Sequence, residues 1–326
     1  MPQFLIWIEK IMHYRTLGKT ELNVSLLSLG TGGPSMFGQN KGLEQNNQTA
    51  LVRRCLDMGI NLIDTHERYK DSEKILGRAL KGVPRDSYNL VTKWAYAPGV
   101  DDFNPDPEAL ARSVERSLQR LRTDHVEVLL FHGLIPEHHD LVVDRYVPVL
   151  QRLKDEGKVK FGGFSLRYVV DPAHEGALTA LGRTPDLWDV IMLKFGILNQ
   201  YASKKVLPLA MEHNVGILNM AAVRFKLPNP KLLAETVADW KARGLVPSDA
   251  LPDADPLGWL ATGDVDSVIS AAYKFAAEHP AIGSVISGTS NIDHMERNVA
   301  ALERPYLPVE SRLKLENLFG HIAEYA

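Results

Sequence analysis

Cysteine is nearly absent from this sequence of 326 residues, in which Cys55 is the only one. A single cysteine cannot form an internal disulfide, which is typical of proteins kept in a reducing cytoplasm. Because Cys55 lies in a helix-like segment, a small buried apolar side chain is a better interpretation of it than a catalytic thiol. We therefore expect a cytoplasmic protein without internal disulfides.

Long apolar runs are also absent, since no stretch of about 18 consecutive apolar residues occurs. The sequence therefore predicts no membrane-spanning helix. The first segment has an apolar core only from Phe4 to Ile8, which is shorter than the roughly 7 to 15 residues of a signal-peptide core. We interpret residues 1–11 as an N-terminal extension that precedes a single domain of residues 12–326.

The sequence has no basic stripe, because its 37 Lys and Arg residues are interspersed with 40 Asp and Glu residues and the net charge is −3. Binding to a nucleic-acid backbone needs clustered cations, so nucleic acid is not an expected partner. His138 and His139 stand beside Glu137, but adjacent histidines lack the spacing of a helix-borne zinc pair, and no metal site is expected. With 45% hydrophobic residues, the chain can instead bury one large core.

The order of the apolar segments indicates a barrel. Short strand-like runs alternate with helical segments along the chain, which favours a parallel sheet with helical crossovers. A hairpin over residues 13–25 precedes this alternation and is expected to cap the bottom of the barrel. The predicted strands are 26–32, 61–64, 88–93, 126–132, 159–165, 189–195, 215–221 and 283–287. The predicted helices are 45–58, 72–81, 107–122, 144–156, 172–181, 203–213, 230–243 and 265–278. Eight strands are enough to close a single α/β domain of the (β/α)8 TIM-barrel class.

A long connection, residues 223–264, follows the seventh predicted strand and includes the Pro- and Asp-rich segment LVPSDALPDADPLGW. Connections of this length are uncommon in compact domains and often act as lids. Because it leaves the barrel at the carboxyl end of a strand, we expect a flap over a bound ligand, with a passive surface insertion as the alternative.

Ionisable residues stand where two of the predicted strands end. Asp64 ends the segment NLID, Tyr69 follows in the next loop, and Lys93 ends the segment YNLVTK. The carboxyl ends of barrel strands open onto one face, so these three side chains can converge as a site. A lysine can stabilise the phenolate of a tyrosine, and a buried ammonium in turn needs a counter-charge such as Asp64. Taken singly, each has a structural alternative: a helix cap, a packed ring or a solvated ammonium.

The segment DTHERYKDSEKILGRAL, followed by VTKW, resembles the aldo-keto reductases, whose pattern is roughly D-T-A-x-x-Y-G-x-S-E-x-x-L-G-x-A-L. The segments YRTLGKTELNVSLLSLGTG, LLFHG, LKDEGKVKFGGFS and ISGTSNIDHMERNVAAL extend this resemblance over almost the whole chain, in family order. His66 and Lys70 depart from the usual Ala and Gly. The resemblance implies that Tyr69 is the general acid or base, that Lys93 tunes it and that Asp64 supports Lys93.

His132 ends the strand-like run VEVLLFH and resembles the family's active-site histidine in the fourth strand. The resemblance implies that it forms a hydrogen bond with the carbonyl or alcohol oxygen of the substrate. Without the resemblance, a lone histidine after an apolar run is more often a satisfied structural residue.

The resemblance also implies a nicotinamide cofactor, NADP(H) or NAD(H), because no side chain can supply a hydride. No convincing G-x-G-x-x-G follows a first strand, so the cofactor is expected at the late loops of the barrel. There, Gly288, Thr289 and Ser290 precede a helix whose free N–H groups could hold a phosphate. The residues expected to bind the cofactor are Thr31, Ser165, Met192, Met220, Arg224, Gly288, Thr289, Ser290, His294, Arg297 and Asn298.

Three positions near the expected carboxamide site depart from the family pattern. Leu166 stands where the family usually has Asn, and Met192 stands where a Gln often binds the carboxamide. Met220 falls where an aromatic residue often stacks on the nicotinamide, a contact that a thioether can replace.

Weak discrimination between NADP and NAD is predicted, because the adenosine loop is poor in cations. Gly288 and Ser290 stand where NADP-using relatives often place a cation, and His294 stands where Arg is common. Arg297, or Arg224 and Lys226 from the preceding loop, could still reach a 2′-phosphate.

Met36, Phe37 and Trp94 are expected to line the substrate pocket, where the two aromatic rings could stack on a sugar. The overall likeness is greatest to bacterial enzymes near the galactose and fucose dehydrogenases. The leading hypothesis is an NAD(P)(H)-dependent oxidoreductase that interconverts a small-molecule carbonyl, as aldehyde, ketone or sugar, and an alcohol. Two alternatives stay open: a cofactor-sensing protein resembling potassium-channel β subunits, and a barrel hydrolase with paired carboxylates.

Overall fold

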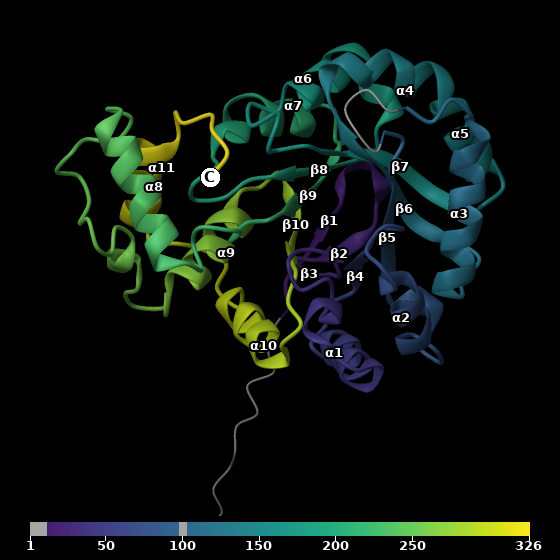
Figure 1. Cartoon of the computed structure of the whole chain (residues 1–326), viewed down its shortest axis with the longest axis horizontal. Helices are drawn as coiled ribbons and strands as arrows, with labels where there is room; N and C mark the ends of the chain where they lie inside the picture. The colour runs from purple at the N-terminus through teal and green to yellow at the C-terminus, as the bar shows by residue number, and fades with distance from the viewer. Residues whose placement is uncertain (1–11, 98–102) are drawn as a thin grey trace, which may run out of the picture.

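Eight parallel strands close into a barrel in the computed structural model, which describes residues 12–97 and 103–326 (Figure 1). The predicted extension of residues 1–11 lies outside the described residues. The barrel strands are β3 (Leu27–Gly30), β4 (Leu62–Asp64), β5 (Asn89–Trp94), β6 (Val126–Leu134), β7 (Val159–Leu166), β8 (Val190–Lys194), β9 (Gly216–Met220) and β10 (Ile282–Ser287). Each pairs with its sequence neighbour, and β10 pairs with both β9 and β3, so the predicted (β/α)8 barrel is confirmed.

The predicted N-terminal hairpin is also confirmed. Strands β1 (Tyr14–Thr16) and β2 (Asn23–Ser25) pair antiparallel, outside the barrel sheet. Leu17, in the turn between them, is fully buried and belongs to the apolar cluster inside the barrel. The hairpin therefore closes the amino-terminal end of the barrel with an apolar plug.

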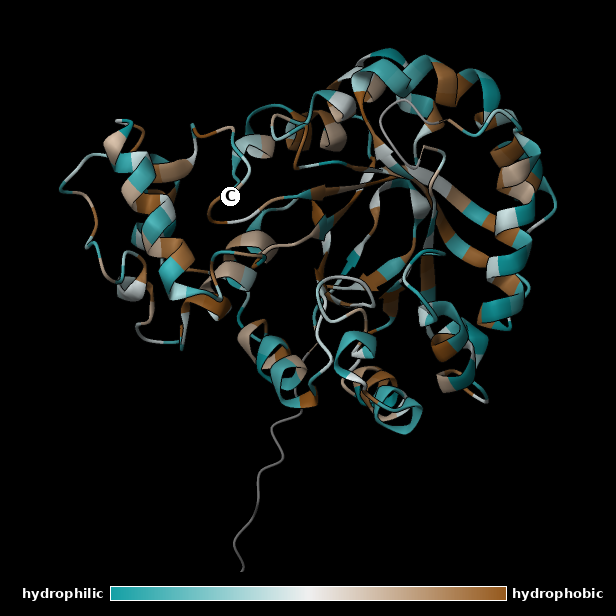
Figure 2. Ribbon diagram, in the orientation of Figure 1, coloured by the Kyte–Doolittle hydropathy of each residue, from teal (hydrophilic) through white to brown (hydrophobic). Residues whose placement is uncertain are grey.

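Most of the helices surround the strands and the others lie to one side, and the largest apolar cluster includes residues from both strands and helices. Their colouring mixes hydrophilic and hydrophobic residues along each helix, as expected for elements with one buried face (Figure 2). They are α1 (Gln45–Asp57), α2 (Ser72–Ala79), α3 (Glu108–Leu121), α4 (His139–Arg145), α5 (Val147–Asp155), α6 (Glu175–Arg183), α7 (Val206–Glu212), α8 (Pro230–Ala242), α9 (Val268–Glu278), α10 (Ile292–Ala301) and α11 (Val309–Phe319). Within the described part of the chain, none of the helices has the length and apolar character needed to cross a membrane.

The helix predicted over residues 144–156 is α5, and a further helix, α4, precedes it and was not predicted. Pro148 lies in the first turn of α5, where its missing N–H does no harm. The same residue could not continue a helix that had begun at His139, because it would break a hydrogen bond in that helix's interior. The chain therefore starts a new helix at Val147.

Helix α8, within the long connection, packs against α11 and the segment that follows it. The rings of Trp240 and Phe319 lie 5.5 Å apart, and Arg243 forms an ion pair with Glu324 at 2.6 Å. The two helices lie side by side at one edge of the molecule (Figure 1). The connection is thus attached through α8 to α11 and the segment after it, and the sequence pattern did not predict α11.

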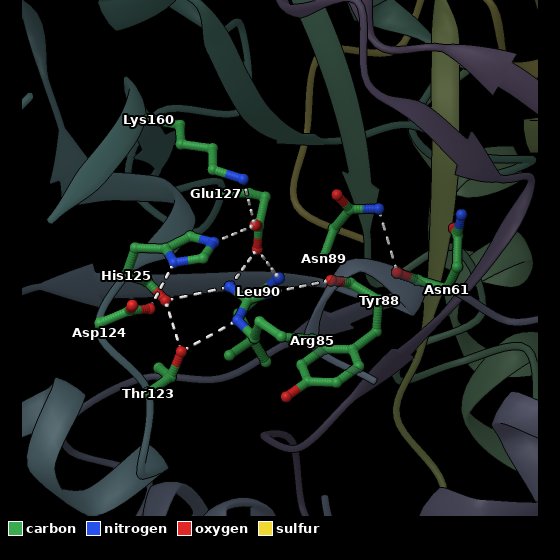
Figure 3. Close-up of polar contacts among 10 residues, drawn as sticks. All are labelled: Asn61, Arg85, Tyr88, Asn89, Leu90, Thr123, Asp124, His125, Glu127 and Lys160. Atoms are coloured by element: carbon green, nitrogen blue, oxygen red, sulfur yellow. Dashed lines mark hydrogen bonds and ion pairs between the residues drawn. The ribbon is translucent and has the colours of Figure 1, made fainter. Parts of the chain in front are cut away.

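A polar network joins the amino-terminal ends of the strands around the buried carboxylate of Glu127 (Figure 3). One of its oxygens accepts hydrogen bonds from Arg85 and from the Leu90 N–H, both at 2.8 Å. The other lies 3.1 Å from both Lys160 Nζ and His125 Nε2. The contacts tie β5, β6 and β7 together at this end of the barrel.

Candidate active site

A cavity of about 980 Å³ opens at the carboxyl-terminal ends of the barrel strands. Residues from most of the strand-to-helix loops line it, which explains how positions distant in sequence meet there. The predicted site residues that line the cavity are Met36, Asp64, Tyr69, Lys93, His132, Ser165, Met192, Met220, Arg224, Gly288, Thr289, His294, Arg297 and Asn298.

Asp64 and Lys93 form a buried ion pair beneath the cavity. Asp64 is the last residue of β4, Lys93 lies near the end of the neighbouring strand β5, and both are almost inaccessible to solvent. Lys93 Nζ donates to the carboxylate of Asp64 and, at 2.8 Å, to the carbonyl of Thr65. Burial by itself would lower the pKa of Lys93, but the neighbouring Asp64 and Tyr69 outweigh that effect and raise it. Lys93 is therefore a charged ammonium at neutral pH.

Tyr69 lies beside this ion pair, in the turn between β4 and α2. Lys93 Nζ is 5.2 Å from the centre of its ring. The ring packs on Gly32 so closely that a Cβ atom there would lie 2.5 Å from it, so this position requires glycine. Burial raises the pKa of the Tyr69 phenol, whereas the charge of Lys93 acts in the opposite direction. The phenol is therefore protonated at neutral pH and has a cation beside it.

Two histidines complete the polar wall next to Tyr69. The ring of His66 stacks on Tyr69 at 5.1 Å between centroids and meets His132 edge-on at 4.7 Å. Burial, with a contribution from Lys93, lowers the pKa of His132 to about 3, so its imidazole is neutral. Sequence reasoning noted His66 only as a departure from the family pattern and gave it no role. That departure, a large polar side chain where alanine is usual, was the available signal.

Four predicted site residues are not among the described residues that line the cavity. Trp94 and Phe37 are only 4% and 1% exposed and belong to the core. Because alternate residues of a strand point to opposite sides, Trp94 points away from the barrel interior when Lys93 points inward, and its ring packs 4.9 Å from that of Tyr146. Thr31 is buried and donates to the carbonyl of Asp64 at 3.0 Å, and Ser290 lies against Gly38.

One hydroxyl and two thioethers from three successive strands line the inner wall of the cavity. They belong to Ser165 in β7, Met192 in β8 and Met220 in β9. The Ser165 hydroxyl accepts a hydrogen bond from the N–H of Gly133 at 3.2 Å, which fixes its orientation. Leu166 also lines the cavity, so the structure places the departures from the family pattern on one wall.

The start of α10 offers fewer free N–H groups than the sequence predicted. The side chain of Asn291 accepts from the N–H groups of Asp293 and His294 at 2.8 and 3.3 Å. Asn298 is also engaged, since it donates to the hydroxyl of Ser287 at 3.0 Å. The Asn291 cap leaves less of the helix end available to an anion than a bare terminus would.

Basic side chains remain at the rim of the cavity, where they could meet a phosphate. His294 and Arg297 are exposed on α10 and line the cavity. Arg224 lines it from the loop after β9, with its guanidinium near Gly33. A ligand could therefore be bound at the rim through an anionic group at one end while its other end reaches Tyr69.

The sequence pattern of the Aldo/keto reductase family matches residues 28–313. The chain is 29% identical over 306 residues to L-galactose dehydrogenase of Arabidopsis thaliana, which covers 88% of this chain and 87% of that protein. It is 27% identical over 314 residues to the NADH-specific methylglyoxal reductase of Escherichia coli, covering 88% of this chain and 92% of that protein. A solved structure, the holo form of an aldo-keto reductase from Bacillus halodurans, is 25% identical with a TM-score of 0.71 and covers 97% of this chain and 98% of that chain. The protein therefore belongs to the aldo/keto reductase family.

Proposed function

We propose that this protein is an NAD(P)(H)-dependent oxidoreductase that interconverts a carbonyl, as aldehyde, ketone or sugar, and an alcohol. The observation that carries the proposal is the position of Tyr69 beside the buried Lys93–Asp64 ion pair, in the same cavity as His132. The relatives named for L-galactose and for methylglyoxal support small hydroxylated or carbonyl compounds as the substrates to test first.

The cavity suits a nicotinamide cofactor in its size and in the chemistry of its lining. Its volume of about 980 Å³ is at the upper end of the roughly 300 to 1,000 Å³ typical of ligand pockets. Ser165, Met192 and Met220 would hold the nicotinamide end, and Arg224 and Arg297 would hold the phosphates. When bound, the cofactor supplies or accepts the hydride.

The residues of the chain supply the proton and hold the substrate oxygen. Tyr69, protonated at neutral pH, donates its proton to the carbonyl oxygen during reduction and takes it back during oxidation. The ammonium of Lys93 stabilises the phenolate that remains, and Asp64 keeps that ammonium charged. The neutral imidazole of His132 forms a second hydrogen bond to the same oxygen and orients it.

A regulatory protein that only senses the cofactor would not need this acid–base arrangement. Asp64, Tyr69, Lys93 and His132 all line the cavity, which favours an enzyme over the cofactor-sensing alternative. A hydrolase with paired carboxylates is disfavoured for a similar reason: Asp64 pairs with Lys93, and Glu67 accepts a hydrogen bond from Ser113.

The test is the absorbance change of NADPH or NADH with a panel of aldehydes, methylglyoxal and aldoses, in the parent chain and in Tyr69→Phe. The substitution removes the proton donor and little volume, so kcat should fall by roughly 10² to 10⁴ while cofactor binding, measured by fluorescence titration, changes little. Tyr306→Phe, at a side chain that is 63% exposed and outside the cavity, is the control and should behave like the parent. Turnover by Tyr69→Phe within a few-fold of the parent would show that another group moves the proton.

A further inference from the structure

His66 occupies a position next to the reacting groups that the proposed mechanism leaves unused. Its ring contacts both Tyr69 and His132, at 5.1 and 4.7 Å between centroids, and it lines the cavity. Only 2% of the residue is exposed to solvent, so its position is set by the protein around it. A substrate whose oxygen reached Tyr69 and His132 would therefore lie against His66.

A hydrogen bond at one ring nitrogen of His66 determines which nitrogen carries the proton. Its Nδ1 accepts from the backbone N–H of Arg68 at 2.7 Å, so Nδ1 bears a lone pair. Burial, together with the charges of His132, Lys93 and Arg68, lowers the pKa of His66 and keeps the ring neutral. A neutral imidazole has one N–H, and here it is at Nε2.

This Nε2–H is a buried donor that has no partner among residues 12–97 and 103–326. Buried donors in folded proteins are almost always paired, because an unpaired one loses its hydrogen bonds to water without replacement. At an enzyme's cavity wall, such a donor is satisfied when a ligand brings an acceptor. The ligand must then carry an oxygen within reach of Nε2.

In the proposed function the reacting carbonyl oxygen already has two hydrogen-bond donors. The acceptor for His66 is therefore a second oxygen of the substrate. A carbonyl oxygen has two lone pairs, and in the proposed function Tyr69 and His132 occupy both. We propose that the Nε2–H of His66 donates to an oxygen on the carbon next to the reacting carbonyl. His66 then selects aldehydes with a 2-hydroxyl or 2-oxo group, a class that includes the open-chain aldoses. This inference rests on the proposed function and specifies its substrate class.

Three aldehydes of three carbons test the inference, because they differ only at the second carbon: propanal, 2-hydroxypropanal and methylglyoxal. The variant His66→Phe keeps a ring against Tyr69 but removes the N–H. We expect the preference for an oxygenated aldehyde over propanal, measured as a ratio of kcat/KM values, to fall roughly tenfold in this variant, the effect of one neutral hydrogen bond. His66→Gln, whose amide can donate again, should restore part of the preference.

The comparison has a matched control and separate outcomes for the two proposals. His213→Phe replaces a histidine after α7, away from the cavity, and should leave the preference unchanged. A loss restricted to 2-hydroxypropanal would identify the acceptor as a hydroxyl, and a loss restricted to methylglyoxal would identify it as a carbonyl. An equal fall for all three aldehydes in His66→Phe, or no change in preference, overturns the inference but leaves the oxidoreductase in place. A parent that turns over other members of the earlier panel but none of these three overturns the inference alone. A parent that turns over no member of either set with either cofactor overturns both.

Discussion

In the proposed function, Lys93 is the side chain on which the chemistry of this cavity most depends. It is buried, it donates to the carboxylate of Asp64 and the carbonyl of Thr65, and it lies 5.2 Å from the ring of Tyr69. A buried ammonium is expensive without a counter-charge, so Asp64 is needed for Lys93 to be charged at all. The ion pair thus has a structural role and an electrostatic one, and they can be separated by experiment.

The substitution Lys93→Met keeps the stem and removes the charge. The charge of Lys93 is the main effect that lowers the pKa of Tyr69 against burial. Without this charge, the pKa of the phenol should rise further. We expect activity to fall and the alkaline limb of the kcat/KM profile to move to higher pH. Asp64 would be left without its partner, at a cost of roughly 3 to 5 kcal/mol, so circular dichroism must first show that the variant folds. Lys160→Met, at the other end of the barrel, is the control. A uniform loss of activity with no shift in the profile would make Lys93 a scaffold residue.

In the proposed function, discrimination between NADP and NAD depends on the basic side chains at the rim of the cavity. Each charge-assisted hydrogen bond to a 2′-phosphate is worth roughly 1.5 to 3 kcal/mol, so two well-placed cations would give a preference of about 100-fold or more for NADP. From Gly288 to Glu296 the chain has no Lys or Arg, so Arg297 is the first such side chain on α10. We expect a preference below 100-fold in kcat/KM with one substrate. A larger preference that disappears in Arg297→Ala but not in Arg224→Ala, or the reverse, would identify the cation responsible.

For single residues, the ends of the predicted strands and the family pattern were enough to predict where the ionisable site residues lie along the strands. They were not enough to predict the direction in which each side chain points. Asp64, Lys93 and His132 were predicted at the strand ends where they lie. Trp94 was expected in the substrate pocket as a ring that could stack on a sugar, yet the alternation of the strand directs it into the core. The role we assign to His66 could not be inferred from sequence, since it requires the tautomer that Arg68 fixes.

The barrel strands and most helices were predictable because each carries its own apolar pattern. Helix α11 was not, since only Leu315, Leu318 and Phe319 of its residues are buried and its apolar stripe is correspondingly narrow. Helix α11 packs on α8 and so attaches that part of the long connection. The role of the connection as a flap was expected from its length and position alone. Of the connection's described residues, Val223, Arg224 and Pro228 line the cavity.

Hydrogen exchange can distinguish a flap from a passive insertion in this connection. We expect the amides of residues 223–228 to exchange more slowly when a saturating cofactor binds, because these residues border the cavity. The amides of α8 should change little, because Trp240 and Arg243 already attach that helix to the segment around α11. Equal exchange of residues 223–228 with and without NADP(H) and NAD(H) would make the connection a passive insertion. Protection that extends across α8 would mean that the whole connection moves.

In the molecule as a whole, the two ends of the barrel handle buried ionisable groups in different ways. At the amino-terminal end, the carboxylate of Glu127 accepts from Arg85, the Leu90 N–H and Lys160, and it serves to hold strands together. At the other end, His66 and His132 lie in the cavity wall, where burial keeps both imidazoles neutral. The contacts around Glu127 stabilise the fold. The buried imidazoles lower its stability in acid, because the folded protein excludes protons that the unfolded chain binds. The proposed function requires these imidazoles to be neutral donors beside Tyr69.

Acid should therefore destabilise the protein through two kinds of group whose effects begin at different pH values. Burial lowers the pKa of His132 to about 3 and that of His174 to about 4, against 6.5 for a free histidine. Below pH 6.5 the unfolded chain binds protons that the folded chain excludes, so stability should fall as the pH drops from 6.5 toward 4. Glu127 behaves differently: burial alone would raise its pKa, but hydrogen bonds from Arg85 and the Leu90 N–H outweigh this and lower it. Its contribution is present above its unfolded value of 4.5 and is lost only below it.

The variant His174→Asn separates these effects, because it removes one buried imidazole far from Glu127. Asparagine tolerates the left-handed backbone at this position, where φ is 62°. Each excluded proton is worth up to about 1.4 kcal/mol per pH unit, so the variant should lose roughly 1 to 2 kcal/mol less than the parent between about pH 6.5 and 5. Urea unfolding at about pH 7.5, 6.5 and 5 measures this difference. The opposite outcome is that Glu127→Gln reduces the loss of stability above about pH 5 and His174→Asn does not. That outcome would mean that Glu127, and not the histidines, makes this fold sensitive to mild acid.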